Sequence, residues 1–223
     1  MKLHVRVLFK HDENDRLIAV NQWNGGIVPR FFLGRTQQGA IWRFHARLPQ
    51  TLMDELSSLC QEETADPFTE PKHKASYLAL LNAHAPDGQV WQGPAYACFQ
   101  KPALSGQTAA ITGENKHLLE GGLEDWLADI PYWQPFMASL EDNKAVAVCA
   151  SVRTFGGAYE AGVETLAAYR QKGHAAHAVS AWANSLLAQN SLPLYSTSWE
   201  NKASQAIARK HGFEFYGSDF HIS

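Results

Sequence analysis

The segment from Tyr169 to Val179, YRQKGHAAHAV, places cations and a glycine directly before residues with helical spacing. The first N–H groups of a helix have no partner inside it, and the aligned peptide dipoles add roughly half a positive charge there. Gly173 lets an anion approach the backbone, and Ala175 keeps the next position uncluttered. Arg170 and Lys172 add full charges beside these amides. The combination predicts a site for a pyrophosphate group.

The same loop has two alternative readings, a site for another ligand and a purely structural turn. It lacks the Lys followed by Ser or Thr of an ATP-binding P-loop and the three glycines of a dinucleotide fingerprint. The structural alternative is a turn shaped by Gly173 with solvated cations. His174 and His177 are three residues apart on a helix, but no third ligand follows at useful spacing, so we expect both to be solvated and no metal to be bound.

The elements around the loop follow a regular order. A strand–helix–strand–helix–strand run predicts a mixed sheet with helices on its faces. The expected strands are 144–153, 159–166, 192–199 and 213–222, and the expected helices are 174–190 and 201–212. In the first of these helices, apolar residues from Ala175 to Leu187 form one stripe, so its first turn is left to meet a ligand.

The preceding part of the chain is predicted to be β-rich at its start and mixed thereafter. Alternating patterns predict strands at 3–9, 16–23, 30–36 and 40–46, and further strands are expected at 93–100 and 108–113. Helical spacing predicts helices at 50–63, 77–84, 115–130 and 133–142, the first opened by Pro49. The polar stretch 64–76 is expected to be a loop.

Composition narrows the class of protein. The chain has 223 residues, 45% of them hydrophobic, and a formal charge of −3 without any block of five or six like charges. We therefore expect a packed core and no nucleic-acid partner. Cys60, Cys98 and Cys149 form no CxxC pair and are expected to be unpaired core thiols. No signal peptide or membrane span is recognised, so we expect a cytoplasmic protein without a membrane partner.

Two segments resemble a known family. Arg170-x-x-Gly173-x-Ala175, directly after the strand AGVETL, resembles motif A of the GNAT superfamily of acyl-CoA-dependent N-acetyltransferases. The later segment YSTSWENKASQAIARKHGFEFYG is similar to the closing segment of that superfamily. The resemblance covers about residues 106–223, which we expect to form a GNAT-like domain. Residues 1–105 match no motif and are expected to be an N-terminal α+β region, either appended or a degenerate copy of the same fold.

The resemblance implies a fold and a cosubstrate. The fold class would be α+β (mixed α/β), with a GNAT-like sheet splayed between the strands 159–166 and 192–199 and flanked by helices. Acetyl-CoA would lie in the gap, its pyrophosphate held by Arg170, Gln171, Lys172, Gly173, His174 and Ala175. Main-chain groups of Thr165 and Leu166 would bind the pantetheine, and Asn201 and Ser204 would face it from the other side. For Asn201 an ordinary helix N-cap is the alternative.

Acyl transfer to an amine requires a general base, because an amine with a pKa around 10 is mostly protonated at neutral pH. Glu160 and Glu164 are four residues apart in a strand and should point to one face. Glu164 is the first candidate for the base and Glu160 the second. The alternative is that either carboxylate is merely on the surface or pairs with Arg153 or Arg170.

The general acid is a departure from the family pattern. GNAT enzymes often place a tyrosine seven residues after the position of Asn201, and here Ala208 occupies it. A thiol of pKa about 8.5 leaves tolerably as a thiolate, so this loss would slow the reaction without abolishing it. Tyr195 in the strand 192–199 is the substitute we consider, with water as the alternative and a packing role for the tyrosine as a third reading.

Three functions follow from this reading. The first is an N-acetyltransferase that moves acetyl from acetyl-CoA to a primary amine of a small molecule or peptide. The second is a non-catalytic acyl-CoA sensor or scaffold, and the third is a domain without affinity for CoA. The sequence leaves the acceptor, the preferred acyl group and the oligomeric state open, with a homodimer among the options.

Overall fold

The computed structural model describes residues 1–223, which divide into two compact units. The first unit contains Met1–Tyr96, Ser196–Lys202 and Phe215–Ser223, and the second contains Ala97–Tyr195 and Ala203–Glu214. The chain first passes from the first unit to the second at residue 97. Most of the C-terminal strand belongs to the first unit, because that strand pairs with the N-terminal half of the chain.

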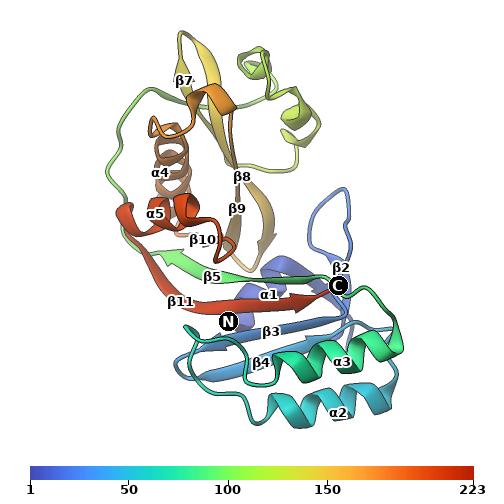
Figure 1. Ribbon diagram of the computed structural model, residues 1–223. Coiled ribbons are helices and arrows are strands. Elements are labelled where there is room, and N and C mark those ends of the chain that lie inside the picture. Colours follow the sequence, from blue (N-terminus) through green and yellow to red (C-terminus); the bar gives the residue numbers. More distant parts are fainter. The chain divides into compact units, whose positions relative to one another are not determined.

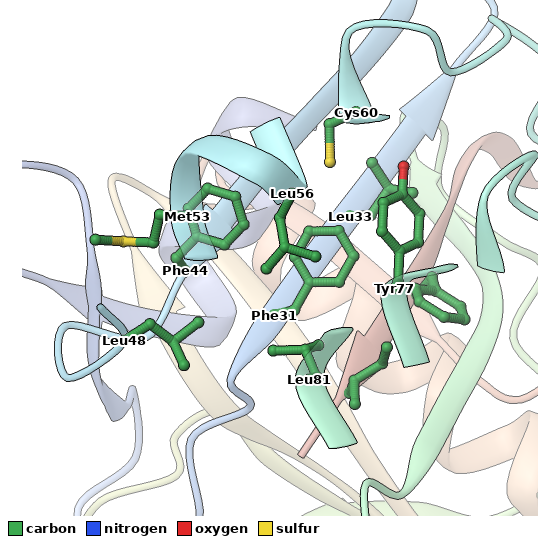
Figure 2. Close-up of a cluster of buried hydrophobic side chains, with 11 residues drawn as sticks. Phe31, Leu33, Phe44, Leu48, Met53, Leu56, Cys60, Tyr77 and Leu81 are labelled. Atoms are coloured by element: carbon green, nitrogen blue, oxygen red, sulfur yellow. The ribbon is translucent and has the colours of Figure 1, made fainter. Parts of the chain in front are cut away.

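The first unit is built on strands in the order β4-β3-β11-β5. Their bounds are β3 Phe31–Thr36, β4 Gly39–Phe44, β5 Val90–Cys98 and β11 Phe213–Ile222. Helices α2 (Gln50–Cys60) and α3 (Lys74–His84) lie together along this sheet (Figure 1). The core between sheet and helices is apolar (Figure 2) and consists of Phe31, Leu33, Phe44, Leu48, Met53, Leu56, Cys60, Tyr77, Leu81, Phe220 and Ile222. Fully burying each large side chain contributes roughly 1.5–3 kcal/mol.

The first residues form a helix, so the strand predicted at 3–9 is wrong. Helix α1 spans Lys2–Leu8, followed by β1 (Phe9–His11), which pairs antiparallel with β2 (Leu17–Val20). Alternation would bury Leu3 and expose His4, but Leu3 is 37% exposed and His4 is 2% exposed. His4 is buried because its Nε2 lies 2.6 Å from a carboxylate oxygen of Asp219. Because His4 is polar, it counts as an exposed position in the sequence and produces a strand-like alternation, although its hydrogen bond allows it to be buried.

The second unit has strands in the order β6-β7-β8-β9-β10. The bounds are β6 Thr108–Ala110, β7 Phe136–Glu141, β8 Lys144–Phe155, β9 Ala158–Thr165 and β10 Leu192–Ser196. Neighbours are antiparallel except β9 and β10, which are parallel. Helix α4 (His174–Leu187) connects these two strands and packs on β7, β8 and β9. Helix α5 (Lys202–Lys210) precedes β11. The helices predicted at 174–190 and 201–212 are therefore confirmed.

Two helices predicted before residue 143 are corrected. Residues 133–142 contain the strand β7, and residues 115–130 contain two short 3₁₀ helices, η1 (Lys116–Leu119) and η2 (Glu124–Asp129), separated by Gly121 and Gly122. The missed signal is the turn after β7, where Asp142 and Asn143 both have positive φ, 50° and 60°. Two such residues form the tight turn that suits a β-hairpin.

The cysteines are unpaired core residues, as the sequence predicts. Cys60, Cys98 and Cys149 are buried and form no disulfide. Burial raises the pKa of Cys60 to about 12 and raises that of Cys149 as well. Since the thiolate is the reactive form, these thiols behave as core residues. None of the helices is long and apolar enough to cross a bilayer.

The hairpin turn gives the first prediction. Asn143→Val should lower the free energy of unfolding by about 1–2 kcal/mol, because a branched side chain clashes in the left-handed region. Asn143→Gly is the control and should keep or slightly raise stability. Urea unfolding followed by circular dichroism measures both. Equal stability of the two variants would contradict the turn geometry.

Candidate functional site

The loop between β9 and α4 has the backbone geometry that its glycine suggests. After the short 3₁₀ helix η3 (Ala167–Tyr169), Gln171 and Gly173 have φ of 64° and 92°. Gly173 is the N-cap of α4, and the first intrahelical bond runs from the His177 amide to the Gly173 carbonyl at 3.1 Å. The amides of His174, Ala175 and Ala176 therefore point out of the helix end. A free donor end of this kind suits a phosphate group.

The cations of the loop are exposed. Arg170 Nε donates to the carbonyl of Thr165 at 3.3 Å, so the guanidinium is held against the end of β9. The Nζ atom of Lys172 lies 5.0 Å from the centre of the Tyr169 ring, within the range of a cation–π contact. Both charges remain exposed beside the amides of α4.

His174 differs from its expected place in solvent. The residue is 9% exposed, and its ring bridges two residues of β7. Nδ1 lies 3.0 Å from Ser139 Oγ, and Nε2 lies 2.9 Å from a carboxylate oxygen of Glu141. The side chain therefore anchors the first turn of α4 to the sheet, and both ring nitrogens are engaged by β7. Its backbone amide is what remains for the predicted cofactor role.

His177 lies on the next turn with its ring against the loop. Its Nε2 is 3.5 Å from the position that a Cβ of Gly173 would take, and its ring packs on Gly106. Burial lowers the pKa of His177, and the neighbouring His174 lowers it further. The neutral imidazole is thus favoured, and the positive charge of the loop comes from Arg170 and Lys172.

The two candidate bases have different environments. Glu160 is 2% exposed and stands opposite Arg153 in the β8–β9 register, and these two groups interact electrostatically. Glu164 is exposed, and one of its carboxylate oxygens accepts a hydrogen bond from Trp126 Nε1. The structure therefore leaves Glu164 accessible and buries Glu160 beside an arginine, which was the alternative weighed for it.

Glu164 points to the face of the sheet opposite α4. It is in register with Val148, whose side chain belongs to the core beneath η1 and η2. On the other face, Trp182 of α4 donates to Ser151 Oγ at 3.0 Å. Because side chains in register share a face, Glu164 lies on the side of η1 and η2.

The main chain of β9 pairs with β8 over a longer stretch than with β10. It pairs with β8 up to Thr165, but its parallel register with β10 ends at Leu194↔Glu160. The amide of Leu166 donates to Val146 and its carbonyl accepts from Tyr169, so Leu166 is engaged within the protein. Main-chain groups alternate in direction along a strand, and those of Thr165 therefore point away from β8. Of the two predicted pantetheine positions, Thr165 is the one so oriented, and its carbonyl accepts the bond from Arg170 Nε.

The structure brings together two of the candidate residues that follow β9 in the chain. The Tyr195 hydroxyl lies 2.6 Å from Ser204 Oγ, which joins the proposed acid to a predicted cofactor-facing residue. Ala208 is fully buried. Asn201 directly precedes α5, and its backbone amide is bonded to Ser198, so the N-cap alternative remains for it.

Sequence reasoning missed Trp126, the partner of Glu164. A tryptophan in a sequence is usually a packing residue, and no local pattern links position 126 to position 164. A weak signal is Gly162 in the middle of a strand, because such a glycine often marks a close approach by another group. An open cleft of about 540 Å³ contains none of the predicted site residues in its lining, which consists of Thr112, Gly113, Lys116, Leu127, Ile130, Pro131 and Gln134.

Comparisons with protein families and solved structures find similarity to GNAT acetyltransferases. Residues 137–218 match the GNAT acetyltransferase family. An acetyltransferase of the GNAT family from Novosphingobium aromaticivorans has a TM-score of 0.50 and 16% identity over 60% of this chain and 64% of its own, just under two thirds. A GCN5-related N-acetyltransferase from Sphaerobacter thermophilus has a TM-score of 0.51 and 14% identity over 82% of this chain and 71% of its own. No curated protein matches.

The family match includes β7 through most of β11, and with it the loop and Glu164. Residues 137–218 are thus similar to the GNAT acetyltransferase family, whose members are acyltransferases, and the mixed sheet flanked by helices resembles the fold of these GNAT structures.

The anchor of α4 gives the second prediction. His174→Ala should lower the free energy of unfolding by about 1–3 kcal/mol, because it leaves the buried Ser139 hydroxyl without its imidazole partner. His177→Ala, one turn further along α4, is the control and should have a smaller effect. Urea unfolding at neutral pH compares them. Equal losses would show that the bridge to β7 does not hold the helix.

Proposed function

We propose that the protein transfers an acetyl group from acetyl-CoA to a primary amine. The observation that carries the proposal is the start of α4 at Gly173, whose outward amides and neighbouring cations lie at the end of the same strand that presents Glu164. An anion held at the loop and a base on β9 would lie on one continuous segment of chain. The family match over residues 137–218 supports acyl transfer as the reaction class.

The residues divide the work between binding and proton transfer. Amides at the start of α4, with Arg170 and Lys172, hold the pyrophosphate. The main-chain amide of Thr165 binds the pantetheine in the manner of an added strand, while the Thr165 carbonyl keeps its bond from Arg170 Nε. Acetyl-CoA supplies a thioester whose carbonyl carbon the amine attacks directly. Glu164 accepts the proton that the amine must lose, directly or through a water.

The departing thiolate requires a proton or must leave as an anion. Tyr195 is buried, but its hydroxyl meets that of Ser204, which is only partly buried. We propose that Ser204 delivers the proton and that the Tyr195 hydroxyl supports Ser204 through their hydrogen bond. This pair would replace the tyrosine that the family often carries at the position of Ala208.

The acceptor is an amine of a small molecule or a peptide. Glu164 faces η1 and η2, so the segment that contains them would form one wall of the acceptor site. The alternative function, a non-catalytic acyl-CoA sensor or scaffold, is favoured by Ala208. Both functions require CoA binding, and only the first requires turnover.

Release of free CoA tests the proposal. Purified protein with acetyl-CoA and a panel of primary amines should liberate thiol, and Glu164→Gln should lower kcat by about 10²–10⁴ because the base is lost. Glu55→Gln, an exposed carboxylate on α2, is the matched control and should leave kcat unchanged. Binding of CoA without turnover for any amine would favour the sensor.

The loop is tested separately. Gly173→Glu should raise the KM for acetyl-CoA, because it adds a negative charge beside the predicted pyrophosphate position. Gly173→Ala carries the same strain at φ 92° without the charge and should have a smaller effect. In wild type, CoA at 100 times its Kd should stabilise the fold by about 2.7 kcal/mol. No thermal shift at millimolar CoA would contradict both CoA-dependent functions.

A further inference from the structure

Glu164 is held by one specific donor. The indole Nε1 of Trp126, on η2, donates to Oε2 of this carboxylate at 2.5 Å. The other carboxylate oxygen, Oε1, is left for a second partner. A glutamate side chain has several rotatable bonds, and an exposed one samples many conformations unless it is bonded.

The indole itself is fixed from three directions. Its ring makes edge contacts with Trp133 and Phe136, each at 5.6 Å between ring centres. The indole edge also lies against β9 at Gly162, where an added Cβ would be 3.4 Å from the ring and only 2.2 Å from the side chain of Val152, so the glycine leaves room for Val152 beside the indole. The strand and the aromatic contacts together set where the N–H group points.

The segment that carries Trp126 is also fixed at the end of β9. The carboxylate of Glu124 accepts the amides of Gly121 and Gly122 at 2.6 and 2.8 Å, which closes the turn between η1 and η2. A Cβ at Gly122 would lie 2.7 Å from the side chain of Leu166, so this turn packs directly on the residue after β9. Trp126 therefore contacts Glu164 from a segment that is held by these hydrogen bonds and by packing on Leu166.

We propose that Trp126 is a positioning residue that holds Glu164 in the conformation needed for proton abstraction. The inference deepens the proposed function and rests on it. Oε2 stays bonded to the indole while Oε1 takes the proton from the amine nitrogen, whose electron pair then forms the bond to the acyl carbon. The indole keeps its own proton throughout. Orientation of this kind can contribute strongly, since a misplacement of about 1 Å can slow a reaction about 10²-fold.

A double-mutant cycle tests the proposal. Trp126→Phe keeps an aromatic ring but removes the donor, and it should lower kcat by about tenfold to a hundredfold with little change in the KM for acetyl-CoA. In a Glu164→Gln background the same change should alter kcat less than about twofold, because the base it positions is gone. Trp133→Phe is the matched control, since it keeps an aromatic ring against Trp126 and its Nε1 has no hydrogen-bond partner, and it should lower kcat far less than Trp126→Phe does.

The outcomes separate the inference from the function beneath it. A wild-type protein that binds CoA but releases none with any amine overturns the proposed function. Turnover in wild type with equal kcat in Trp126→Phe overturns the inference alone. Equal losses in the two backgrounds, or equal losses from Trp126→Phe and Trp133→Phe, also overturn it by showing a packing effect. Thermal melting of all variants verifies folding, and the melting losses of Trp126→Phe and Glu164→Gln should be less than additive.

Discussion

The site depends on the unequal pairing of one strand. β9 is bonded to β8 along its length, yet its register with β10 ends at Glu160. A strand that loses a neighbour exposes main-chain donors and acceptors, and these must find another partner. Thr165 lies in this part of β9, next to Glu164. The proposed pantetheine-binding group and the proposed base therefore share one short piece of backbone.

Rigid supports surround this piece on both faces of the sheet. On one face, the ring of His174 bridges to Ser139 and Glu141 and fixes where α4 begins. On the other, the turn closed by Glu124 places Trp126 on Glu164. The contrast between Glu160 and Glu164 arises from these surroundings, because both side chains leave the same strand on the same face and only one is covered.

The sequence predicts the elements whose signals are local. The helix after Gly173 and the strands beside it follow from periodicity and one glycine, and they are where they were expected. Residues 2–8 were misread because buried His4 imitates an exposed position, and its partner Asp219 is far away in the chain. β7 was misread although its turn at Asp142 carried a hairpin signal. The bond between Trp126 and Glu164 could not be predicted, because it exists only after two distant segments have packed.

The pairing of the first unit has a consequence for synthesis in the cell. His4 and Asp219 are 215 positions apart, and β3 pairs with the last strand. As the ribosome releases the chain from its N-terminus, β3 and β4 emerge long before their neighbour β11 exists. The apolar surface of β3 stays uncovered by β11 until that strand has been synthesised, and contacts of such long sequence separation form slowly. Chaperone dependence during translation should accordingly be concentrated in the N-terminal half.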